Sequence, residues 1–300
     1  DYWIVKLTST GEIEWEKSLG GSGSDQAYSI VQTSDSGYIV AGESFSPDGD
    51  VTGNHGGLNY WIVKLRSTGE IEWEKSLGGS GLDGARSIVQ TSNGGYIVAG
   101  YSDFPNGDVT GNHGRSDSWI VKLTSTGKIE WEKSLGGSEF DAATSIAQTS
   151  DGGYIVAGNS NSTDGDVTGN HGRSDSWIVK LTSTGKIEWE KSLGGSEFDA
   201  ATSIAQTSDG GYIVAGNSSS TDGDVTENHG SDDYWIVKLG STGDIEWEKS
   251  LGVAGDDRAT SIAQTSDGGY IVAGYSEPIN SDGTINYEAY DFWIVKLYWE

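Results

Sequence analysis

The amino-acid sequence predicts an all-β chain built from five equal repeats, and three observations support this. The Trp of the phrase WIVKL stands at positions 3, 61, 119, 177, 235 and 293, a constant spacing of 58 residues. Each repeat holds short β-branched and aromatic runs that end at Gly, Ser, Thr or Asn, as in strands joined by tight turns. No repeat shows the apolar spacing of a helix. We expect residues 1–300 to form one domain, with a sixth WIVKL copy at 291–297.

The second repeat shows the expected elements in order. YWIVKL (60–65) and EIEWEKS (70–76) are joined by the turn RSTG, while ARSIVQT (85–91) and YIVAGYS (96–102) are joined by a turn ending in Gly-Gly. Glycine supplies the positive φ that such turns require. Apolar and charged residues alternate in IEWEK, which predicts a strand with one face in water. YIVAG and WIVKL are almost continuously apolar, which predicts strands covered on both faces.

These four strands predict how the repeats pack. One four-stranded sheet of this size cannot bury both of its faces alone, whereas five such sheets arranged around an axis cover one another. The expected architecture is therefore a five-bladed β-propeller with four-stranded antiparallel blades.

The repeat also resembles a known family. The order D-x-A-x-S-I-x-Q-T-S-D-G-G-Y-I-V-A-G, then a loop, then W-I-V-K-L-x-S-T-G-x-I-E-W, is similar to the repetitive β-propeller repeats of secreted bacterial and archaeal proteins, the SBBP type, and more distantly to the NHL repeat. The resemblance covers essentially the whole chain. It implies that SIVQT is the inner strand, followed outward by YIVAG, WIVKL and IEWEK. It implies little about function, because propellers host binding, scaffolding and catalysis alike.

This strand order leads to a prediction about the chain ends. We expect the ring to close by joining N- and C-terminal strands in one blade, in which 13–17 completes the strands that start near Ser261 and Tyr270. Either Trp3–Leu7 or Trp293–Leu297 supplies the remaining strand of that blade. The other copy is surplus, and it could cap a sheet edge or pair with a neighbouring molecule.

The composition excludes several partner classes. Eighteen basic and 45 acidic residues give a formal charge of −27, which repels nucleic-acid phosphates and anionic lipid headgroups. No apolar run reaches the roughly 18 residues needed to span a bilayer, so we expect no direct membrane insertion. The chain has no Cys, which excludes disulfides, thiol catalysis and zinc–thiolate sites. Abundant Gly, Ser, Thr and Asn with an acidic surface are typical of an extracellular or cell-surface microbial protein.

The long loop between YIVAG and WIVKL carries repeated oxygen donors. In four repeats they follow a D-x-D-x-x-x-N spacing, with Asn replacing the first Asp in the second repeat. These donors could wrap a hard cation such as Ca²⁺, although the Glu that completes an EF-hand loop is absent. The same residues could instead cap a tight turn through their own backbone. They are Asp48, Asp50 and Asn54; Asn106, Asp108 and Asn112; Asp164, Asp166 and Asn170; and Asp222, Asp224 and Asn228. Calcium is the one candidate cofactor, and no cofactor is required.

Three other repeated sets allow a functional and a structural interpretation. The histidines could bind a transition metal or sense pH, but symmetric positions on different blades are too far apart to share one ion. The Asp before each inner strand could be catalytic, but five equivalent copies favour a structural hydrogen bond to the backbone of the neighbouring loop. The outer-strand tryptophans could stack on sugars or pack between blades. The sets are His55, His113, His171 and His229; Asp25, Asp83, Asp141, Asp199 and Asp257; and Trp15, Trp73, Trp131, Trp189 and Trp247.

The near identity of the repeats argues against catalysis. An enzyme needs one asymmetric constellation of groups, whereas repeats 119–176 and 177–234 differ at only five positions. We expect a non-enzymatic extracellular scaffold, structural, adhesive or interacting, that meets a protein or glycan at the loop face bearing DGDVTGNH. The alternatives are a multivalent lectin-like propeller and a filament subunit that self-associates through the surplus strand.

Overall fold

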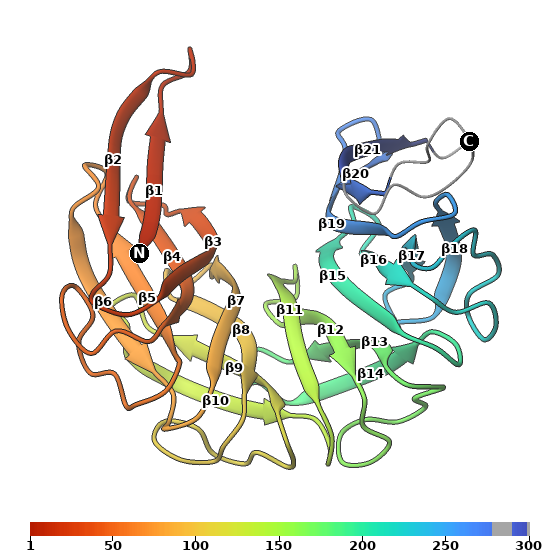
Figure 1. Cartoon of the computed structure of the whole chain (residues 1–300), viewed down its shortest axis with the longest axis horizontal. Coiled ribbons are helices and arrows are strands. Elements are labelled where there is room, and N and C mark those ends of the chain that lie inside the picture. The colour runs from red at the N-terminus through yellow and green to blue at the C-terminus, as the bar shows by residue number, and fades with distance from the viewer. Residues whose placement is uncertain (278–289, 299–300) are drawn as a thin grey trace. The chain divides into compact units, whose positions relative to one another are not determined.

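The computed structural model describes residues 1–277 and 290–298, and over these residues it consists of strands and connecting turns without a helix (Figure 1). Accordingly, no helix in this part of the chain is long and apolar enough to cross a membrane. The chain divides into two compact units, residues 1–136 and residues 137–300.

The first compact unit contains three antiparallel sheets. A two-stranded sheet pairs β1 (Tyr2–Leu7) with β2 (Ile13–Leu19). The next sheet has the order β3 (Asp25–Gln32), β4 (Tyr38–Ser44), β5 (Asn59–Leu65), β6 (Ile71–Leu77). The third has the order β7 (Asp83–Gln90), β8 (Tyr96–Ser102), β9 (Asp117–Leu123), β10 (Ile129–Leu135).

The second compact unit also contains three antiparallel sheets. The first is β11 (Asp141–Gln148), β12 (Tyr154–Ser160), β13 (Asp175–Leu181), β14 (Ile187–Leu193). The second is β15 (Asp199–Gln206), β16 (Tyr212–Ser218), β17 (Asp233–Leu239), β18 (Ile245–Leu251). The last has three strands, β19 (Asp257–Gln264), β20 (Tyr270–Ser276) and β21 (Asp291–Leu297).

The expected all-β fold of repeated four-stranded antiparallel sheets is confirmed. Each complete sheet follows chain order from SIVQT outward to IEWEK. Gly69 in the turn RSTG and Gly94 in the turn after β7 have φ of 80° and 82°, as their turns require. Closure of a ring stays a prediction: β2, which contains 13–17, pairs with β1, and the C-terminal WIVKL copy, β21, pairs with β20.

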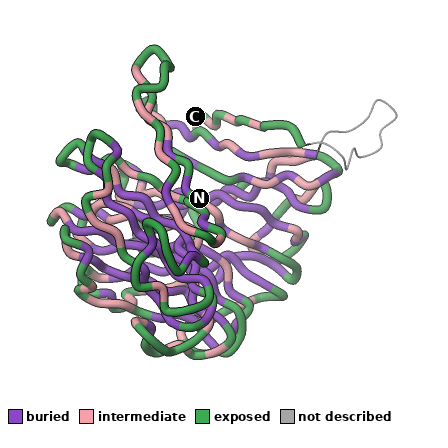
Figure 2. Tube along the Cα trace, turned by 60° about the vertical axis from the view of Figure 1, so that its left-hand side comes forward, coloured by how far each residue is buried: buried purple, intermediate pink, exposed green. Residues whose placement is uncertain are grey.

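The core forms where the WIVKL strand of one sheet meets the next sheet. All seven residues of β5 and of β9 are buried, and purple buried segments follow the strands in Figure 2. The Tyr60 hydroxyl donates to the Trp119 carbonyl oxygen at 2.9 Å, and the two rings lie 4.6 Å apart. Burying such aromatic side chains between sheets supplies the main driving force for association of the repeats.

The first and last sheets lack this cover on one side. Trp3 of β1 is 70% exposed, whereas its repeat equivalents Trp61 and Trp119 are 0% exposed. In the last sheet Phe292 is 96% exposed and Ile294 is 65% exposed. In the interior sheets a neighbouring repeat buries the equivalent positions. Both end sheets therefore carry apolar side chains suited to a neighbouring sheet, and their own compact units do not provide that sheet.

A buried lysine on each WIVKL strand is held by the turn after the inner strand. Lys64 and Lys180 are at most 3% exposed, and their Nζ atoms lie 2.9 Å from Asp35 Oδ2 and Asp151 Oδ2. Lys238 lies 3.1 Å from Asp209 Oδ2 in the same way. A threonine hydroxyl two residues earlier and the lysine together lower the pKa of Asp35 and Asp151 to about 2. Hydrogen bonds from the Thr207 hydroxyl and the Gly211 amide likewise lower the pKa of Asp209 to about 2.

These aspartates predict an acid-dependent loss of stability. Their pKa values are lower in the folded chain than the usual value near 4, so their contribution is complete above about pH 4 and disappears as the pH falls toward 2. The replacement Asp151→Asn should flatten this part of the stability profile, and Asn93, which holds the equivalent position in β7–β10, is the natural precedent. Urea denaturation at stepwise pH between 2 and 5 measures it. An unchanged slope for Asp151→Asn would contradict the assignment.

Candidate functional site

The long loop of each complete sheet is tied to the segment that precedes the inner strand. Asp48 Oδ1 accepts the Ser22 amide at 2.8 Å, and Asp50 Oδ2 accepts the Gly20 amide at 3.2 Å. Asn54 Nδ2 donates to the Ser44 carbonyl oxygen at 3.2 Å. The equivalent side chains of later repeats make the corresponding bonds, and these side chains are Asn106, Asp108, Asn112, Asp164, Asn170, Asp222, Asp224 and Asn228. The two segments therefore lie together at one end of each complete sheet.

These contacts tie the candidate calcium ligands Asp48 and Asp50 to the preceding segment rather than to the backbone of their own turn, whereas Asn54 accepts the nearby Gly56 amide as a local cap. Their oxygens receive backbone N–H donors, which satisfies both the loop and the preceding segment. Among the described residues no three His, Cys, Asp or Glu side chains gather as a metal site. Calcium binding stays a prediction, and calorimetric titration of the chelated chain tests it. Binding heat with a rise in melting temperature would support the site, and the absence of both would remove it.

The Asp before each inner strand is a buried structural residue. Asp25, Asp83, Asp141, Asp199 and Asp257 are at most 3% exposed. Each accepts the backbone amide four residues before it, at 2.7 to 3.0 Å. Asp199 Oδ2 also accepts the Ser220 hydroxyl at 2.8 Å, and burial raises the pKa of this carboxyl. The set therefore has a structural role, since it joins the preceding segment to the YIVAG strand.

Three of the four histidines contact a buried aspartate. The Nδ1 atoms of His113, His171 and His229 lie 2.6 to 2.7 Å from an Asp carboxylate that opens the next strand, while each imidazole is less than half exposed. Burial raises the pKa of one of these partners, Asp175. In the first repeat Asn59 replaces the aspartate and accepts the His55 amide at 2.7 Å. Each histidine is thus anchored within its own loop.

The outer-strand tryptophans are half-buried, and the rings of Trp15, Trp73, Trp189 and Trp247 each lie near a Tyr ring of the next repeat in the same compact unit. Trp15 lies 5.7 Å from the Tyr38 ring and donates its indole N–H to the Ser67 carbonyl oxygen at 3.1 Å. A Cβ at Gly69 would lie 3.0 Å from the Trp15 ring, so glycine allows this turn to cover it. Packing against the next repeat therefore accounts for the partial burial of these rings, and sugar stacking stays a prediction.

The second Glu of IEWEK has a role that alternation alone did not indicate. Glu74 accepts the Trp61 indole N–H at 2.9 Å and the Thr52 hydroxyl. The three later complete sheets repeat both contacts through Glu132, Glu190 and Glu248. This residue lies on the face predicted to be in water, yet it joins the long loop to two strands.

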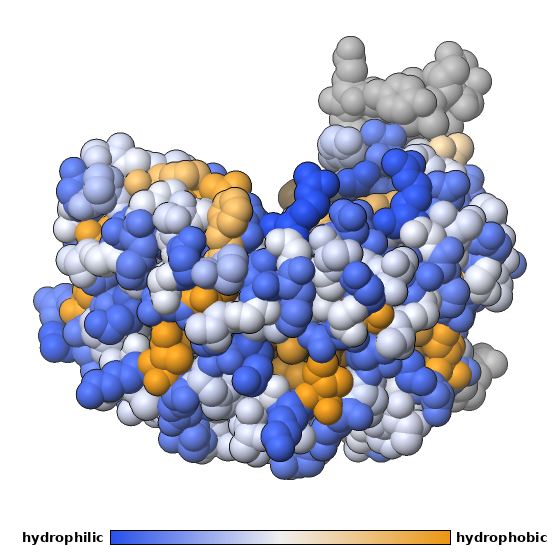
Figure 3. Space-filling view, turned by 90° about the horizontal axis from the view of Figure 1, so that it is seen from below, coloured by the Kyte–Doolittle hydropathy of each residue, from blue (hydrophilic) through white to orange (hydrophobic). Residues whose placement is uncertain are grey.

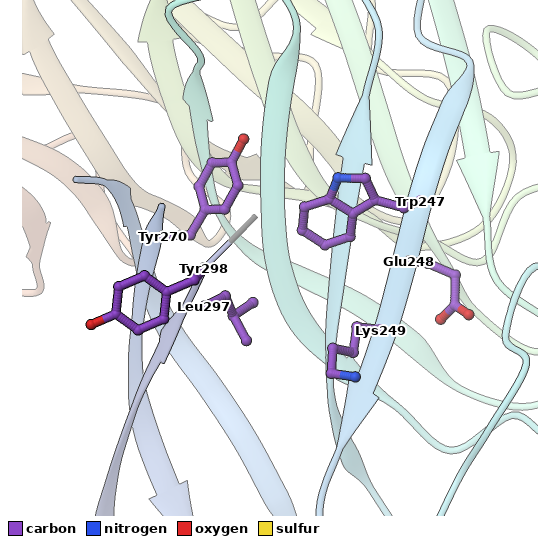
Figure 4. Close-up of a pocket in the computed structure, with 6 residues that line it drawn as sticks. All are labelled: Trp247, Glu248, Lys249, Tyr270, Leu297 and Tyr298. Carbon is purple, nitrogen blue, oxygen red and sulfur yellow. The ribbon is translucent and has the colours of Figure 1, made fainter. Parts of the chain in front are cut away.

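Figure 4 shows the cavity left beside Trp247 in the last sheets. Its volume is about 260 Å³, and Trp247, Tyr270, Leu297 and Tyr298 contribute to its lining. The rings of Trp247 and Tyr270 lie 5.8 Å apart, as in earlier repeats. In those repeats the turn after WIVKL covers the equivalent Trp, whereas here Tyr298 follows β21 and points away from Trp247 (Figure 4). The cavity therefore has the position of an uncovered interface between repeats.

Elsewhere the exposed apolar residues are scattered. Phe45, Phe104, Phe140 and Phe198 are 39 to 56% exposed and lie in loops before or after strands. On the face shown in Figure 3, hydrophobic residues form small separate groups between hydrophilic ones. Scattered residues of this kind do not form the continuous apolar patch that marks a large interface.

One group of contacts breaks the repeat, and the sequence reasoning missed it. Tyr28, Glu43, Arg86 and Tyr101 gather between sheets β3–β6 and β7–β10. The Arg86 guanidinium lies 4.0 Å from the Tyr28 ring centre and 5.2 Å from that of Tyr101, and it bonds Glu43 at 3.0 Å. Positions equivalent to Tyr28 and Arg86 hold Thr144, Thr202 and Thr260 in the other repeats. This departure from the repeat was the available signal.

Comparisons with known proteins give only distant similarities. No family model matches the chain. It is 25% identical over 309 residues to the regulatory protein FlaEY of Caulobacter vibrioides, covering 91% of this chain but 31% of that protein. The chain therefore spans about a third of this relative. Among solved structures, Sqt1 from Chaetomium thermophilum has a TM-score of 0.34 at 10% identity, covering 85% of this chain and 81% of that one. BamB from Moraxella catarrhalis has 0.33 at 13% identity, covering 96% and 89%.

Proposed function

We propose that the chain is a non-enzymatic interaction scaffold of an extracellular or cell-surface protein, which binds a protein or a glycan through the loops bearing DGDVTGNH. The observation that carries this proposal is the repeated fixation of those loops. In four sheets equivalent Asp or Asn side chains bond equivalent backbone groups, so each loop holds its exposed Thr and His on a rigid support. Repeated, pre-ordered loops favour a partner that contacts several of them at once.

The geometry of the polar groups supports a binding role over a catalytic one. The repeated aspartates before the inner strands are buried and accept backbone N–H groups. A general acid or base must instead reach the proton of a bound substrate. The loop histidines His113, His171 and His229 are partly accessible instead, with 42 to 45% of each side chain exposed. They are well placed for contact with a partner.

The loop-face proposal is tested on an array of immobilised extracellular proteins and neutral and acidic oligosaccharides. The variant changes His55, His113, His171 and His229 to Gln, which keeps an N–H for the anchoring residue. A matched control changes Thr10, Thr68, Thr126 and Thr184 to Ala on the opposite rim. We expect at least about tenfold weaker binding for the His variant, because the contacts act together, and no change for the control. Binding that survives the His→Gln changes, or no binding to any probe, would contradict the proposal.

We further propose that the repeats form a five-bladed propeller whose terminal strands meet in one blade. The first sheet supplies only the two outer strands, and the last sheet supplies the three inner ones. A hollow of about 240 Å³ lined by Trp3, Tyr28 and Ile30 lies where the first sheet lacks its inner strands. Ile30 is 50% exposed there, whereas Ile88 in the next sheet is 1% exposed. The first sheet lacks the two inner strands that the last sheet contains as β19 and β20, and the last sheet lacks the outermost strand that the first contains as β2.

The same exposed faces favour self-association as a second candidate. Trp3, Phe292 and Ile294 would also be covered if the ends of two molecules met. Chains lacking Asp1–Leu7 or Asp291–Glu300 separate the two outcomes when their masses are measured in solution over a range of concentrations. A mass that grows with concentration only when both segments are present supports self-association. The same monomeric mass for every chain contradicts it.

A further inference from the structure

The inner strand of every repeat contains a β-bulge, and the residue at the bulge differs between repeats. The pairing of inner strand and YIVAG strand shifts after Ala27, Ala85, Ala143, Ala201 and Ala259, which leaves the next residue outside the ladder. Such a residue is re-aimed relative to the regular strand, and bulges recur beside binding sites. The five bulge residues are Tyr28, Arg86, Thr144, Thr202 and Thr260.

In the later repeats the bulge residue is structural. Thr144 Oγ1 donates to the Ala157 carbonyl oxygen at 3.0 Å or to that of Ala201, in the next inner strand, at 2.7 Å. Thr202 repeats both contacts. Tyr28 and Arg86 cannot make this compact hydroxyl bridge between inner strands. The first two inner strands therefore carry a large aromatic residue, Tyr28, and a cation, Arg86, where the later ones carry threonine.

The exchanged residues form a pre-ordered cluster. The Tyr28 hydroxyl lies 2.9 Å from Gln26 Oε1 and 3.0 Å from Glu43 Oε1, and can donate to either. Glu43 is 8% exposed and fixes the Arg86 guanidinium through its other oxygen. Tyr28 remains 44% exposed and the Arg86 side chain 28% exposed. The planar guanidinium is thus held against the aromatic rings while most of its five N–H donors are left for other partners.

We propose that Tyr28, Glu43, Arg86 and Tyr101 form a single binding site for a neutral saccharide. Aromatic rings contact the C–H faces of a sugar, and a fixed guanidinium donates to its hydroxyl oxygens. Glu43 cancels the charge of Arg86, and the chain carries a formal charge of −27, so an anionic ligand is repelled. The site differs from the repeated loop-face sites because its four residues lie on β3, β4, β7 and β8 rather than in the loops, and no other pair of repeats carries this combination of residues.

The site stays open beside a neighbouring sheet. Arg86 lies in β7, which already has β3 packed before it: Ser29 Oγ of β3 accepts the Ile88 amide at 3.2 Å. Arg86 nevertheless keeps 28% of its side chain exposed. In a closed ring the added inner strands would fill part of the hollow that Tyr28 lines, and Tyr28 would then have a preceding neighbour as Arg86 does. The proposed saccharide site is therefore compatible with a closed ring, and it does not depend on one.

The test uses the full-length chain and an array of immobilised neutral and acidic oligosaccharides, followed by calorimetry with the saccharide bound best. The variant Arg86→Thr restores the residue of the later repeats, so the fold should be kept. Because Glu43 loses its ion-pair partner, a melting curve measures any loss of stability separately from the loss of binding. Arg66→Thr is the matched control, since it makes the same change of charge at an exposed turn where other repeats also carry Thr. We expect at least about tenfold weaker saccharide binding for Arg86→Thr and for Tyr28→Thr. The control Arg66→Thr should bind the saccharide as tightly as the unmodified chain.

Three outcomes would overturn the proposal: no neutral saccharide bound by the unmodified chain, unchanged affinity in Arg86→Thr, or an acidic saccharide bound more tightly than every neutral one. The loop-face proposal fails separately. Saccharide binding that survives the four His→Gln changes but not Arg86→Thr belongs to this cluster, and the reverse result assigns the saccharide to the loops.

Discussion

Replacing Trp119 with alanine is expected to lower the free energy of unfolding by about 3–5 kcal/mol, the usual cost of removing a large buried aromatic side chain. Trp119 is 0% exposed, its ring lies 4.6 Å from that of Tyr60, and its indole N–H donates to Glu132 Oε2 at 2.8 Å. Alanine would leave a cavity between two sheets and remove one of the donors to Glu132, which keeps its contacts with Thr110. Urea denaturation followed by circular dichroism measures the loss.

The control for this prediction is an equally large truncation at the surface. Phe104 is 56% exposed in a loop of the same compact unit. Phe104→Ala should therefore cost less than about 1 kcal/mol. Equal losses for Trp119→Ala and Phe104→Ala would contradict the view that packing between sheets, rather than aromatic content in general, stabilises the repeats.

The second large effect is expected for Asp199→Ala, which should destabilise the chain by about 3 kcal/mol. Asp199 is 0% exposed and accepts the Gly195 amide and the Ser220 hydroxyl, each at 2.8 Å. Removing the carboxylate leaves both donors buried without an acceptor. The replacement Asp199→Asn keeps one acceptor oxygen, so it should cost less. Thermal and urea denaturation of the three proteins measure the order.

Asp244 provides the matched control for the loss of one carboxylate. Its side chain is 75% exposed and forms a surface ion pair with Lys191 at 3.2 Å. Asp244→Ala should change stability by less than about 1 kcal/mol, as for most exposed ion pairs. A stable Asp199→Ala protein would show that the repeated aspartates do not hold the fold, and it would reopen the catalytic interpretation.

The sequence predicted the features that depend on local chemistry. Strand runs, glycine turns and the repeat period are encoded within a few residues, and these were recovered in the four-stranded sheets. The role of the buried aspartates followed from their multiplicity. The bond of Asp48 to the Ser22 amide was not predicted, because the sequence suggested a cap of the local turn and Ser22 lies 26 positions earlier.

Features that depend on distant contacts were not recovered. Alternation placed Glu74 in water, because nothing in IEWEK indicates that a loop threonine and the Trp61 indole converge on it. Arg86 and Glu43 lie 43 positions apart in the chain, so no local pattern connects them. Tyr28 and Arg86 also occur once each at a position that is threonine in the other repeats, so they belong to no repeated motif. Exposure of Trp3 and Phe292 also could not be read from WIVKL, because the same phrase is buried in interior sheets.

The most direct test of the account is a pair of engineered disulfides across the chain ends, in a protein that has no cysteine of its own. Interior sheets pair the repeat equivalents of Glu16 with Val295, and of Val5 with Val272. If one blade contains strands from both termini, Glu16→Cys with Val295→Cys, or Val5→Cys with Val272→Cys, should form a disulfide within single molecules at low protein concentration. Free thiols in both double variants, or disulfides formed only between molecules, would contradict the closed propeller.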